Sequence, residues 1–342
     1  MKTLYLTTDP STRTQSIQTA ARLLREGRIV AFPTETVYGL GANAFDEKAV
    51  LQVFAVKGRP KDNPMIVHVH HPDQARELMQ TVQDLFDELV NEFWPGPLTL
   101  IVRRNAAIPD VVTAGLDTVA VRMPDLPVTR SMLRCAGVPV AAPSANLSGR
   151  PSPTDAHSVY EDLQGRISAV LDGGECPVGI ESTVLDLTCE VPTILRPGTV
   201  TREDLEDVIQ SRVFFADAHA ERPLSPGMKY RHYAPKAQLY VVLPEHADMA
   251  SVLAAVLAEH ASAGRRVGLL APEAMRGMGE AAFFSLHAGT PVEYARGLYA
   301  GLRALDAEGV DVILCPGIAA VSYTHLRAHE TVLDLVCRLL LE

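Results

Sequence analysis

The sequence lacks several features that would assign it to a common class. Its five cysteines are scattered, odd in number, and form no CxxC pair. This pattern argues against a disulfide framework or a zinc site and fits reduced thiols in the cytoplasm. No apolar run reaches 18 residues, so we expect no membrane span. The N-terminus turns polar too quickly for a secretory signal.

The usual nucleotide-binding motifs are also missing. No GxxxxGK[ST] P-loop occurs, and no GxGxxG fingerprint follows a predicted strand, since Gly39-Leu40-Gly41 is only a fragment of one. Ser144 does not stand in a GxSxG elbow, which argues against a hydrolase of that type. A formal net charge of −10 argues against wholesale electrostatic binding of nucleic acid, but it permits a local basic pocket.

The order of predicted elements indicates two domains, as the length of 342 residues also suggests. Up to about residue 210, helix-like and strand-like segments alternate, with a helix over 14–26, strands over 65–69 and 118–123, and a capping box at Thr201. A second series starts at residue 238 and predicts a small α/β domain with a parallel sheet. Its elements are a strand to 243, a helix over 247–263, a strand over 266–270, a helix over 291–307 and a strand over 310–314.

A cationic turn is the most informative local feature. Lys57, Arg59 and Lys61 fall within five residues, between prolines and ahead of an apolar run. Clustered Lys and Arg on a stiff backbone suit a polyphosphate, because Arg supplies a planar fork of donors and Lys a compact charge. The alternative is a surface turn whose cations pair with Asp62 and Glu47, and this segment alone leaves both interpretations open.

Arg122 stands among apolar residues near the end of a predicted strand. Burying it is costly unless it meets an anion, which is either an Asp or Glu of the chain or a substrate carboxylate, and we favour the substrate. His68, His70 and His71 resemble a metal site at first sight. However, alternation separates His71 from the other two, and no carboxylate or cysteine lies nearby at ligand spacing. We therefore expect His68 to line a pocket as a donor.

Polar turns collect at the ends of predicted buried strands. Each alone is compatible with ordinary turn chemistry, but their number indicates a site that offers donors to phosphate or ribose oxygens. These turns are residues 143–149, 172–174, 179–183 and 196–198.

Eight ordered sequence blocks carry a resemblance to a known family. They are PTETVYGLG, KGRPKDNPMIVHV, FWPGPLTL, TAGLDTVAVRMP, PVAAPSANLSGRPSPT, GIESTVLDL, ILRPG and SPGMKYRHYAP. Together they resemble the YrdC family in its long two-domain form, the L-threonylcarbamoyladenylate synthases. The match spans about residues 10 to 235 and continues more weakly to about 320.

The resemblance implies an α/β fold: a twisted mixed-sheet catalytic domain with a concave basic cavity, and a smaller Rossmann-like C-terminal domain. On this basis we expect a catalytic domain over 1–212, a connector over 213–237 that closes over the active site, and a C-terminal domain over 238–320. Residues 321–342 depart from the family pattern and resemble translated adapter sequence joined to a truncated gene. A genuine divergent terminus is the alternative.

The resemblance also implies the reaction. L-Threonine, bicarbonate and ATP with Mg²⁺ would give threonylcarbamoyl-AMP and pyrophosphate, and a tRNA-threonylcarbamoyl transferase in the cytoplasm would receive the product. Two other functions stay open: a non-catalytic RNA-binding module that uses the same basic cavity, and adenylation of a different carbamoyl acceptor. A weak RNA contact could also accompany catalysis, whereas no membrane role is expected.

The site residues follow from the resemblance one position at a time. Lys57 and Arg59 would stabilise charge on the triphosphate, and no covalent nucleophile is expected. The implied ATP-binding residues are Arg59, Asn63, Thr118, Ser144, Asn146, Ser152, Arg196 and Tyr233. The implied threonine-binding residues are Thr36, His68, Arg122, Ala142 through its backbone, and Ser182. No protein side chain is assigned to a metal.

Overall fold

The structure is a computed structural model that describes residues 2–216, 235–242, 248–286 and 291–317. The chain forms two compact units. The first comprises Met1–Ser148, Ser152–Pro177 and Glu181–Tyr230, and the second comprises Gly149–Pro151, Val178–Ile180 and Arg231–Glu342. The predicted domain boundaries stay predictions, because most of the 213–237 connector and all of the 321–342 tail lie outside the described residues.

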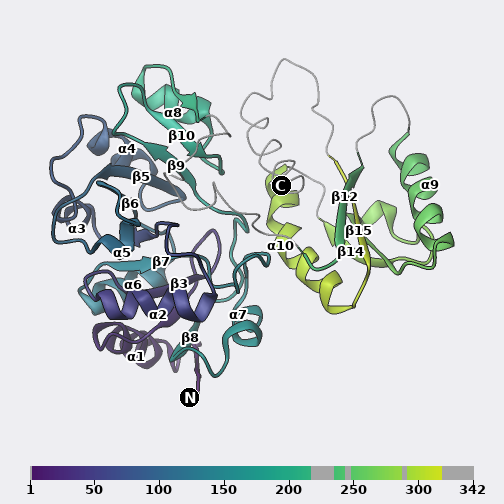
Figure 1. Cartoon of the computed structure of the whole chain (residues 1–342), viewed down its shortest axis with the longest axis horizontal. Coiled ribbons are helices and arrows are strands. Elements are labelled where there is room, and N and C mark those ends of the chain that lie inside the picture. The colour runs from purple at the N-terminus through teal and green to yellow at the C-terminus, as the bar shows by residue number, and fades with distance from the viewer. Residues whose placement is uncertain (1, 217–234, 243–247, 287–290, 318–342) are drawn as a thin grey trace. The chain divides into compact units, whose positions relative to one another are not determined.

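The first unit is built on a mixed 11-stranded sheet (Figure 1) with the strand order β1-β8-β2-β3-β7-β4-β6-β5-β9-β10-β11. Its strands are β1 (Leu4–Thr7), β2 (Val30–Phe32), β3 (Gly39–Asn43), β4 (Ile66–His68), β5 (Leu98–Arg103), β6 (Thr118–Arg122), β7 (Val140–Ala142), β8 (Ala169–Asp172), β9 (Thr183–Asp186), β10 (Thr193–Arg196) and β11 (Phe214–Phe215). The sheet contains parallel pairs, such as β1 with β8 and β4 with β6, and antiparallel pairs, such as β3 with β7 and β5 with β6. The predicted mixed α/β sheet is confirmed.

Helices cover both faces of this sheet. They are α1 (Arg13–Arg25), α2 (Glu47–Lys57), α3 (Pro72–Glu77), α4 (Phe86–Phe93), α5 (Asp110–Thr113), α6 (Pro127–Ala136), α7 (Ala156–Leu163) and α8 (Arg202–Ile209). Helices α1 and α6 pack on one face, where they meet Val30, Val140 and Leu171. The intervening side chains Ala31 and Ala141 point into the larger core on the opposite face, as the two-residue period of a strand requires.

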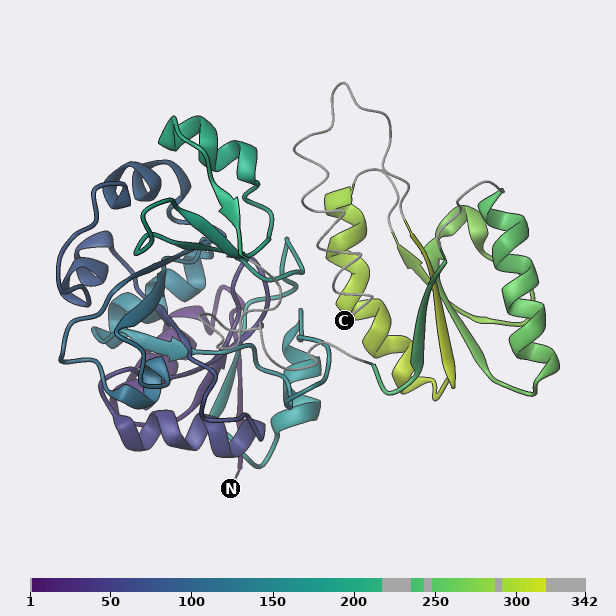
Figure 2. The same ribbon diagram turned by 45° about the horizontal axis from the view of Figure 1, so that its top comes forward.

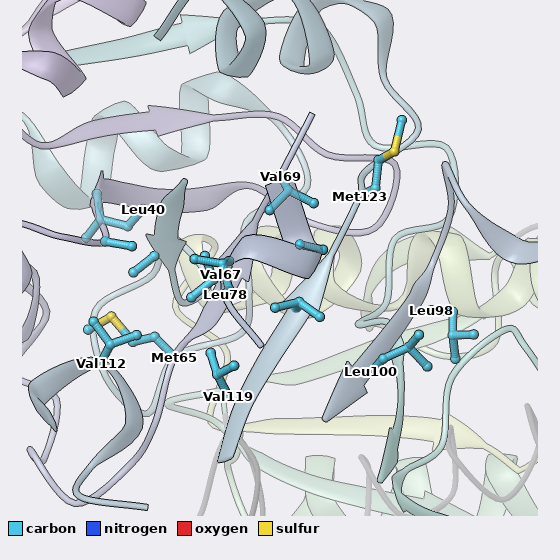
Figure 3. Close-up of a cluster of buried hydrophobic side chains, with 14 of the residues drawn as sticks. Leu40, Met65, Val67, Val69, Leu78, Leu98, Leu100, Val112, Val119 and Met123 are labelled. Atoms are coloured by element: carbon cyan, nitrogen blue, oxygen red, sulfur yellow. The ribbon is translucent and has the colours of Figure 1, made fainter. Parts of the chain in front are cut away.

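The larger core joins side chains from strands and helices that are far apart in the sequence. Figure 3 shows part of it, where Val67 of β4 lies near Met65, Val112 and Val119. Trp94 belongs to the same core and is only 8% exposed. This packing fixes the sheet from which the polar residues project.

Helices α1 and α6 cover only part of their face of the sheet. Over strands β4, β6, β5, β9 and β10 it holds a small apolar cluster to which no described helix contributes, formed by Ile66, Ile101, Ala120, Val184 and Leu195. His68 belongs to this face, because it pairs directly with Val140 on one side and with Arg122 on the other. The polar side chains at the ends of these strands therefore lie beside the part of this face that no described helix covers.

Local sequence signals account for the helix that leads into the cationic turn. Asp46 caps α2, and its side chain accepts hydrogen bonds from the backbone N–H groups of Lys48 and Ala49. The helix ends at Lys57, after which Gly58 takes a left-handed conformation at φ 67° and turns the chain. The predicted capping box is also confirmed, since Thr201 and Asp204 exchange hydrogen bonds at the start of α8.

The second unit is a smaller sheet with a helix on each face (Figures 1 and 2). Its elements are β12 (Gln238–Val242), α9 (Met249–Ser262), β13 (Val267–Pro272), the 3₁₀ helix η1 (Glu273–Met275), β14 (Ala282–Leu286), α10 (Pro291–Ala307) and β15 (Val312–Pro316). The four strands are all parallel, in the order β12-β15-β13-β14. Leu269 packs on the α9 side, whereas Gly268 and Leu270 approach α10. The predicted parallel α/β domain is confirmed, although β14 was not predicted.

Within the described part of the chain, every helix is too short or too polar to span a membrane.

Candidate active site

The cationic turn is buried rather than exposed. Lys57 is 3% and Arg59 is 9% exposed, so the interpretation as a solvated surface turn is wrong for these two residues. Arg59 donates from Nε to the carbonyl of Asn63 at 3.3 Å and from Nη2 to the carbonyl of Pro64 at 2.9 Å. These bonds hold the backbone of the turn against the guanidinium group of Arg59.

Lys57 contacts the loop over residues 143–147, which is part of the polar turn 143–149 that was predicted to belong to a site. Its Nζ lies 2.7 Å from the carbonyl oxygen of Ser144, 2.7 Å from that of Asn146, and 2.8 Å from Oδ1 of Asn146. Burial and the neighbouring Arg59 charge lower the pKa of Lys57 well below its usual value, while Glu181 and Asp162 oppose that shift. The structure thus brings together Lys57, Ser144 and Asn146.

Arg122 meets an acidic partner that the sequence did not single out. Its Nη2 forms an ion pair with Oε1 of Glu35 at 2.6 Å, and both side chains are buried. Its Nε donates to the carbonyl of Gly96 at 3.2 Å, and Nη1 donates to Oγ1 of Thr36 at 2.9 Å. A guanidinium carries five N–H groups, so two of them have no partner among the described residues. The ion pair and a further anion can therefore share one guanidinium group.

Asn63 and His68, two buried side chains close to the buried cations, have polar atoms without hydrogen-bond partners in the described structure. Asn63 is fully buried and leaves both side-chain amide atoms unpaired, and His68 is 4% exposed with an unpaired Nδ1. Burial and the Arg122 charge lower the pKa of His68 from 6.5 to about 3, so its ring is neutral at physiological pH. Unpaired buried polar groups are rare in native proteins, and their presence beside buried cations indicates a ligand site.

A third group of polar residues lies around the start of β9. The Oγ of Ser182 lies 2.8 Å from Oγ1 of Thr99, and it accepts a hydrogen bond from Nη2 of Arg196 at 3.1 Å. Ser152 donates to Oε1 of the neighbouring Glu181 at 2.6 Å, and both residues are buried. The backbone N–H of Thr183 bonds the carbonyl of Pro97, next to the Gly96 that contacts Arg122. These bonds link the Ser182 group to the Arg122 group.

The remaining predicted residues are less closely connected. Ala142 is the last residue of β7 and pairs with Ile66 of β4. Strand β4 therefore lies between Ala142 and the strand β6 that carries Arg122. Thr118 starts β6, four residues before Arg122, which places their backbones about 13 Å apart at the rise of a strand. Tyr233 lies outside the described residues. The functional roles of all these residues stay predictions.

Sequence reasoning missed Glu35, Glu181 and Thr99, each of which bonds directly to a predicted site residue. Glu35 and Glu181 stand inside two of the motif blocks, next to Thr36 and Ser182. That adjacency was the available signal. Among the described residues, no group of three or more His, Cys, Asp and Glu side chains is placed to hold a metal ion.

Comparison with known proteins identifies the family. The family model described as "Telomere recombination", for Sua5, YciO and YrdC proteins, matches residues 22–198. A second model, described as "Threonylcarbamoyl-AMP synthase, C-terminal domain", matches residues 200–328. The chain therefore belongs to the Sua5/YciO/YrdC family in its two-domain form.

Two curated relatives and one solved structure define the branch of that family. Threonylcarbamoyl-AMP synthase of Pyrococcus abyssi is 45% identical over 305 residues, with 88% of each chain covered. The Bacillus subtilis enzyme of the same name is 45% identical over 317 residues, with 90% of each covered. The crystal structure of P. abyssi Sua5 complexed with L-threonine matches with a TM-score of 0.89 and 40% identity, and it covers 99% of this chain and 96% of that one. The predicted family and the predicted enzyme class, threonylcarbamoyl-AMP synthase, are confirmed.

Proposed function

We propose that the buried polar group around Arg122, His68 and Asn63 makes threonylcarbamoyl-AMP from L-threonine, bicarbonate and ATP, and releases pyrophosphate. The observation that carries the proposal is the set of unpaired polar atoms on Asn63 and His68 beside buried cations. Buried polar atoms in native proteins nearly always have a hydrogen-bond partner, and a bound ligand would supply one here. The similarity to synthases over nearly the whole chain supports the same conclusion.

We assign the amino acid to the Arg122 side of the site. The two N–H groups of Arg122 without described partners suit the threonine carboxylate. Neutral His68, together with Thr36 and Ser182, would bind the hydroxyl and amine, and the backbone of Ala142 would complete the contacts. The P. abyssi relative, which is described as complexed with L-threonine, supports this assignment.

We assign ATP to the cationic turn and the polar loops. Asn63, Ser144, Asn146, Ser152 and Arg196 would bind the nucleotide, with Thr118 at the far end of β6 and Tyr233 from the connector. Arg59 would stabilise the departing pyrophosphate by contact, and Lys57 would add positive charge from its buried position. No group of three or more His, Cys, Asp and Glu side chains among the described residues is placed to hold a metal ion, so Mg²⁺ would enter with ATP and neutralise phosphate charge.

The chemistry that we propose needs no covalent nucleophile. The threonine amine adds to CO₂ with loss of a proton, or condenses with bicarbonate with loss of water. The resulting carbamate oxygen attacks the α-phosphorus while the bond to pyrophosphate breaks. Such a transfer depends mainly on positioning and on charge stabilisation. The described residues would supply both, because Arg122 would hold the amino acid and Arg59 would face the leaving group. A separate transferase would then carry the threonylcarbamoyl group to tRNA in the cytoplasm.

Pyrophosphate release from the full chain tests this proposal. The protein would be incubated with ATP, Mg²⁺ and bicarbonate, together with threonine, serine or no amino acid, and the adenylate would be identified by mass spectrometry. We expect release with threonine and a large loss in Arg122→Gln, whereas Lys61→Gln, which neutralises an exposed lysine of the cationic turn, serves as the control. Absence of release together with salt-sensitive RNA retention would favour the RNA-binding alternative, and release with another acceptor would favour a different carbamoyl substrate.

A further inference from the structure

The geometry of Lys57 differs from that of a phosphate ligand. It is the last residue of α2, and its Nζ has three oxygen neighbours between 2.7 and 2.8 Å. An ammonium group has three N–H donors and no acceptor. All three donors are therefore directed at a single loop, residues 143–147, and none remains for a triphosphate.

The 143–147 loop is held at several points besides Lys57. The carbonyl of Pro143 accepts from the backbone N–H of Leu40, and the N–H of Ala145 donates to the carbonyl of Tyr38, both at 2.8 Å. Within the loop, Oγ of Ser144 donates to Oδ1 of Asn146 at 2.6 Å. Tyr38 and Leu40, at the start of β3, thus hold one side of the loop, and Lys57 holds the other.

The two cations of the turn are used differently. Arg59 donates to two carbonyls of its own turn, at Asn63 and Pro64. Lys57 instead reaches 87 and 89 positions along the chain, to Ser144 and Asn146. If Lys57 turned toward a phosphate, the carbonyl oxygens of Ser144 and Asn146 and the amide oxygen of Asn146 would lose a charged donor. That loss is costly at Asn146, where both hydrogen bonds are buried.

We infer that Lys57 is a positioning residue that locks the 143–147 loop, and that it acts on the nucleotide only through Ser144 and Asn146. The inference rests on the proposed function for the identity of the ligand, ATP. It changes the role that the family resemblance implies for Lys57, because direct charge stabilisation of the triphosphate then falls to Arg59. Burial and the Arg59 charge depress the pKa of Lys57, and the three acceptor oxygens favour its ammonium form.

Hydrogen exchange tests the loop lock without any ligand. In the full chain, Lys57→Met keeps the length of the stem and removes all three donors, and Lys61→Met changes an exposed lysine of the same turn. We expect backbone amides of residues 145–148 to exchange at least about tenfold faster in Lys57→Met and at the wild-type rate in Lys61→Met. Unchanged exchange in Lys57→Met would overturn the inference. Lys57→Gln, which retains one donor group, serves if the methionine variant does not fold.

ATP affinity, measured by calorimetry, separates positioning from contact. Loss of the charged hydrogen bonds should weaken ATP binding about 10- to 100-fold in Lys57→Met. Lys57→Arg should bind ATP as weakly as Lys57→Met, because a planar guanidinium group cannot place three donors on the same three oxygens. An arginine at this position could still reach a phosphate, so direct contact would keep the affinity. Restoration of affinity by arginine would contradict the inference.

A double-mutant cycle adds a third readout. If Lys57 acts through the loop, Lys57→Met combined with Asn146→Ala should bind ATP within about threefold of the weaker single variant. Losses that multiply would show independent contacts and would refute the positioning role. Wild-type protein that binds no ATP would instead refute the proposed function, so the two failures are distinguishable.

Discussion

The buried histidine of β4 makes the stability of the first unit depend on pH in a defined direction. His68 is neutral in the folded protein because burial and the Arg122 charge lower its pKa from 6.5 to about 3. In the unfolded chain the same ring is protonated as the pH falls through 6.5. Between these two pKa values the folded state therefore binds fewer protons than the unfolded state. The contribution of neutral His68 to the free energy of unfolding is fully present above pH 6.5 and is lost as the pH falls to about 3.

The magnitude follows from the two pKa values. Between pH 7 and pH 5 the difference in proton binding destabilises the folded state by about 2 kcal/mol, and the limit below pH 3 is about 5 kcal/mol. His68→Gln removes the titrating ring and should remove this slope. All other histidines are common to both proteins, so their contributions cancel in the comparison.

Urea unfolding at pH 7, 6 and 5 and constant ionic strength provides the assay. The single tryptophan, Trp94, lies in the core of the first unit and reports on its unfolding by fluorescence. We expect the wild type to lose about 2 kcal/mol more than His68→Gln between pH 7 and pH 5. Parallel stability curves for the two proteins would refute the reasoning, because they would show that His68 titrates normally in the folded state.

Three further perturbations test other parts of the site. Glu35→Ala leaves the buried Arg122 charge without its partner and should cost about 3–5 kcal/mol in urea unfolding, more than Glu35→Gln; an unchanged midpoint would mean that the ion pair does not support the fold. Asn63→Leu removes two unpaired buried polar atoms, so the ligand-free protein should gain about 1 kcal/mol while the rise of Tm with added ATP disappears; a rise equal to that of the wild type would exclude Asn63 from the nucleotide site. Gly198→Ala places a Cβ 2.3 Å from the backbone nitrogen of Thr183 and should destabilise by about 1–3 kcal/mol, as thermal unfolding would show; wild-type Tm would contradict that close approach.

The sequence was sufficient where a local physical signal specified the structure. The apolar spacing predicted α1 to within a residue at each end, and Thr201 marked the start of α8 because its side chain caps a nearby N–H group. Strand β3 was not predicted, because glycine is unusual in strands. The structure supplies the reason, since a Cβ on Gly41 would come within 2.6 Å of Phe32 and 2.7 Å of Val140.

The sequence predicted which residues gather at the candidate site, but it predicted only some of the contacts among them. The apolar surroundings of Arg122 correctly indicated a buried cation, and both anions that we considered remain compatible with its geometry, since Glu35 takes one N–H group. Glu35 itself could not be selected from many acidic residues without the fold. The partners of Lys57 were even less accessible, because two of the three are backbone carbonyls, which every residue carries.

The pairing of β1 with β8 has a consequence for synthesis on the ribosome. Leu4 aligns with Ala169, and β2 also borders β8, so the first two strands lack their common neighbour until that segment has emerged. At typical translation rates, the growing chain waits roughly 10–30 s with those edges exposed. The sheet of the first unit therefore cannot be completed until β8 has been synthesised. Truncated chains that stop before residue 169 should be substrates for chaperones or proteases rather than partly active enzymes.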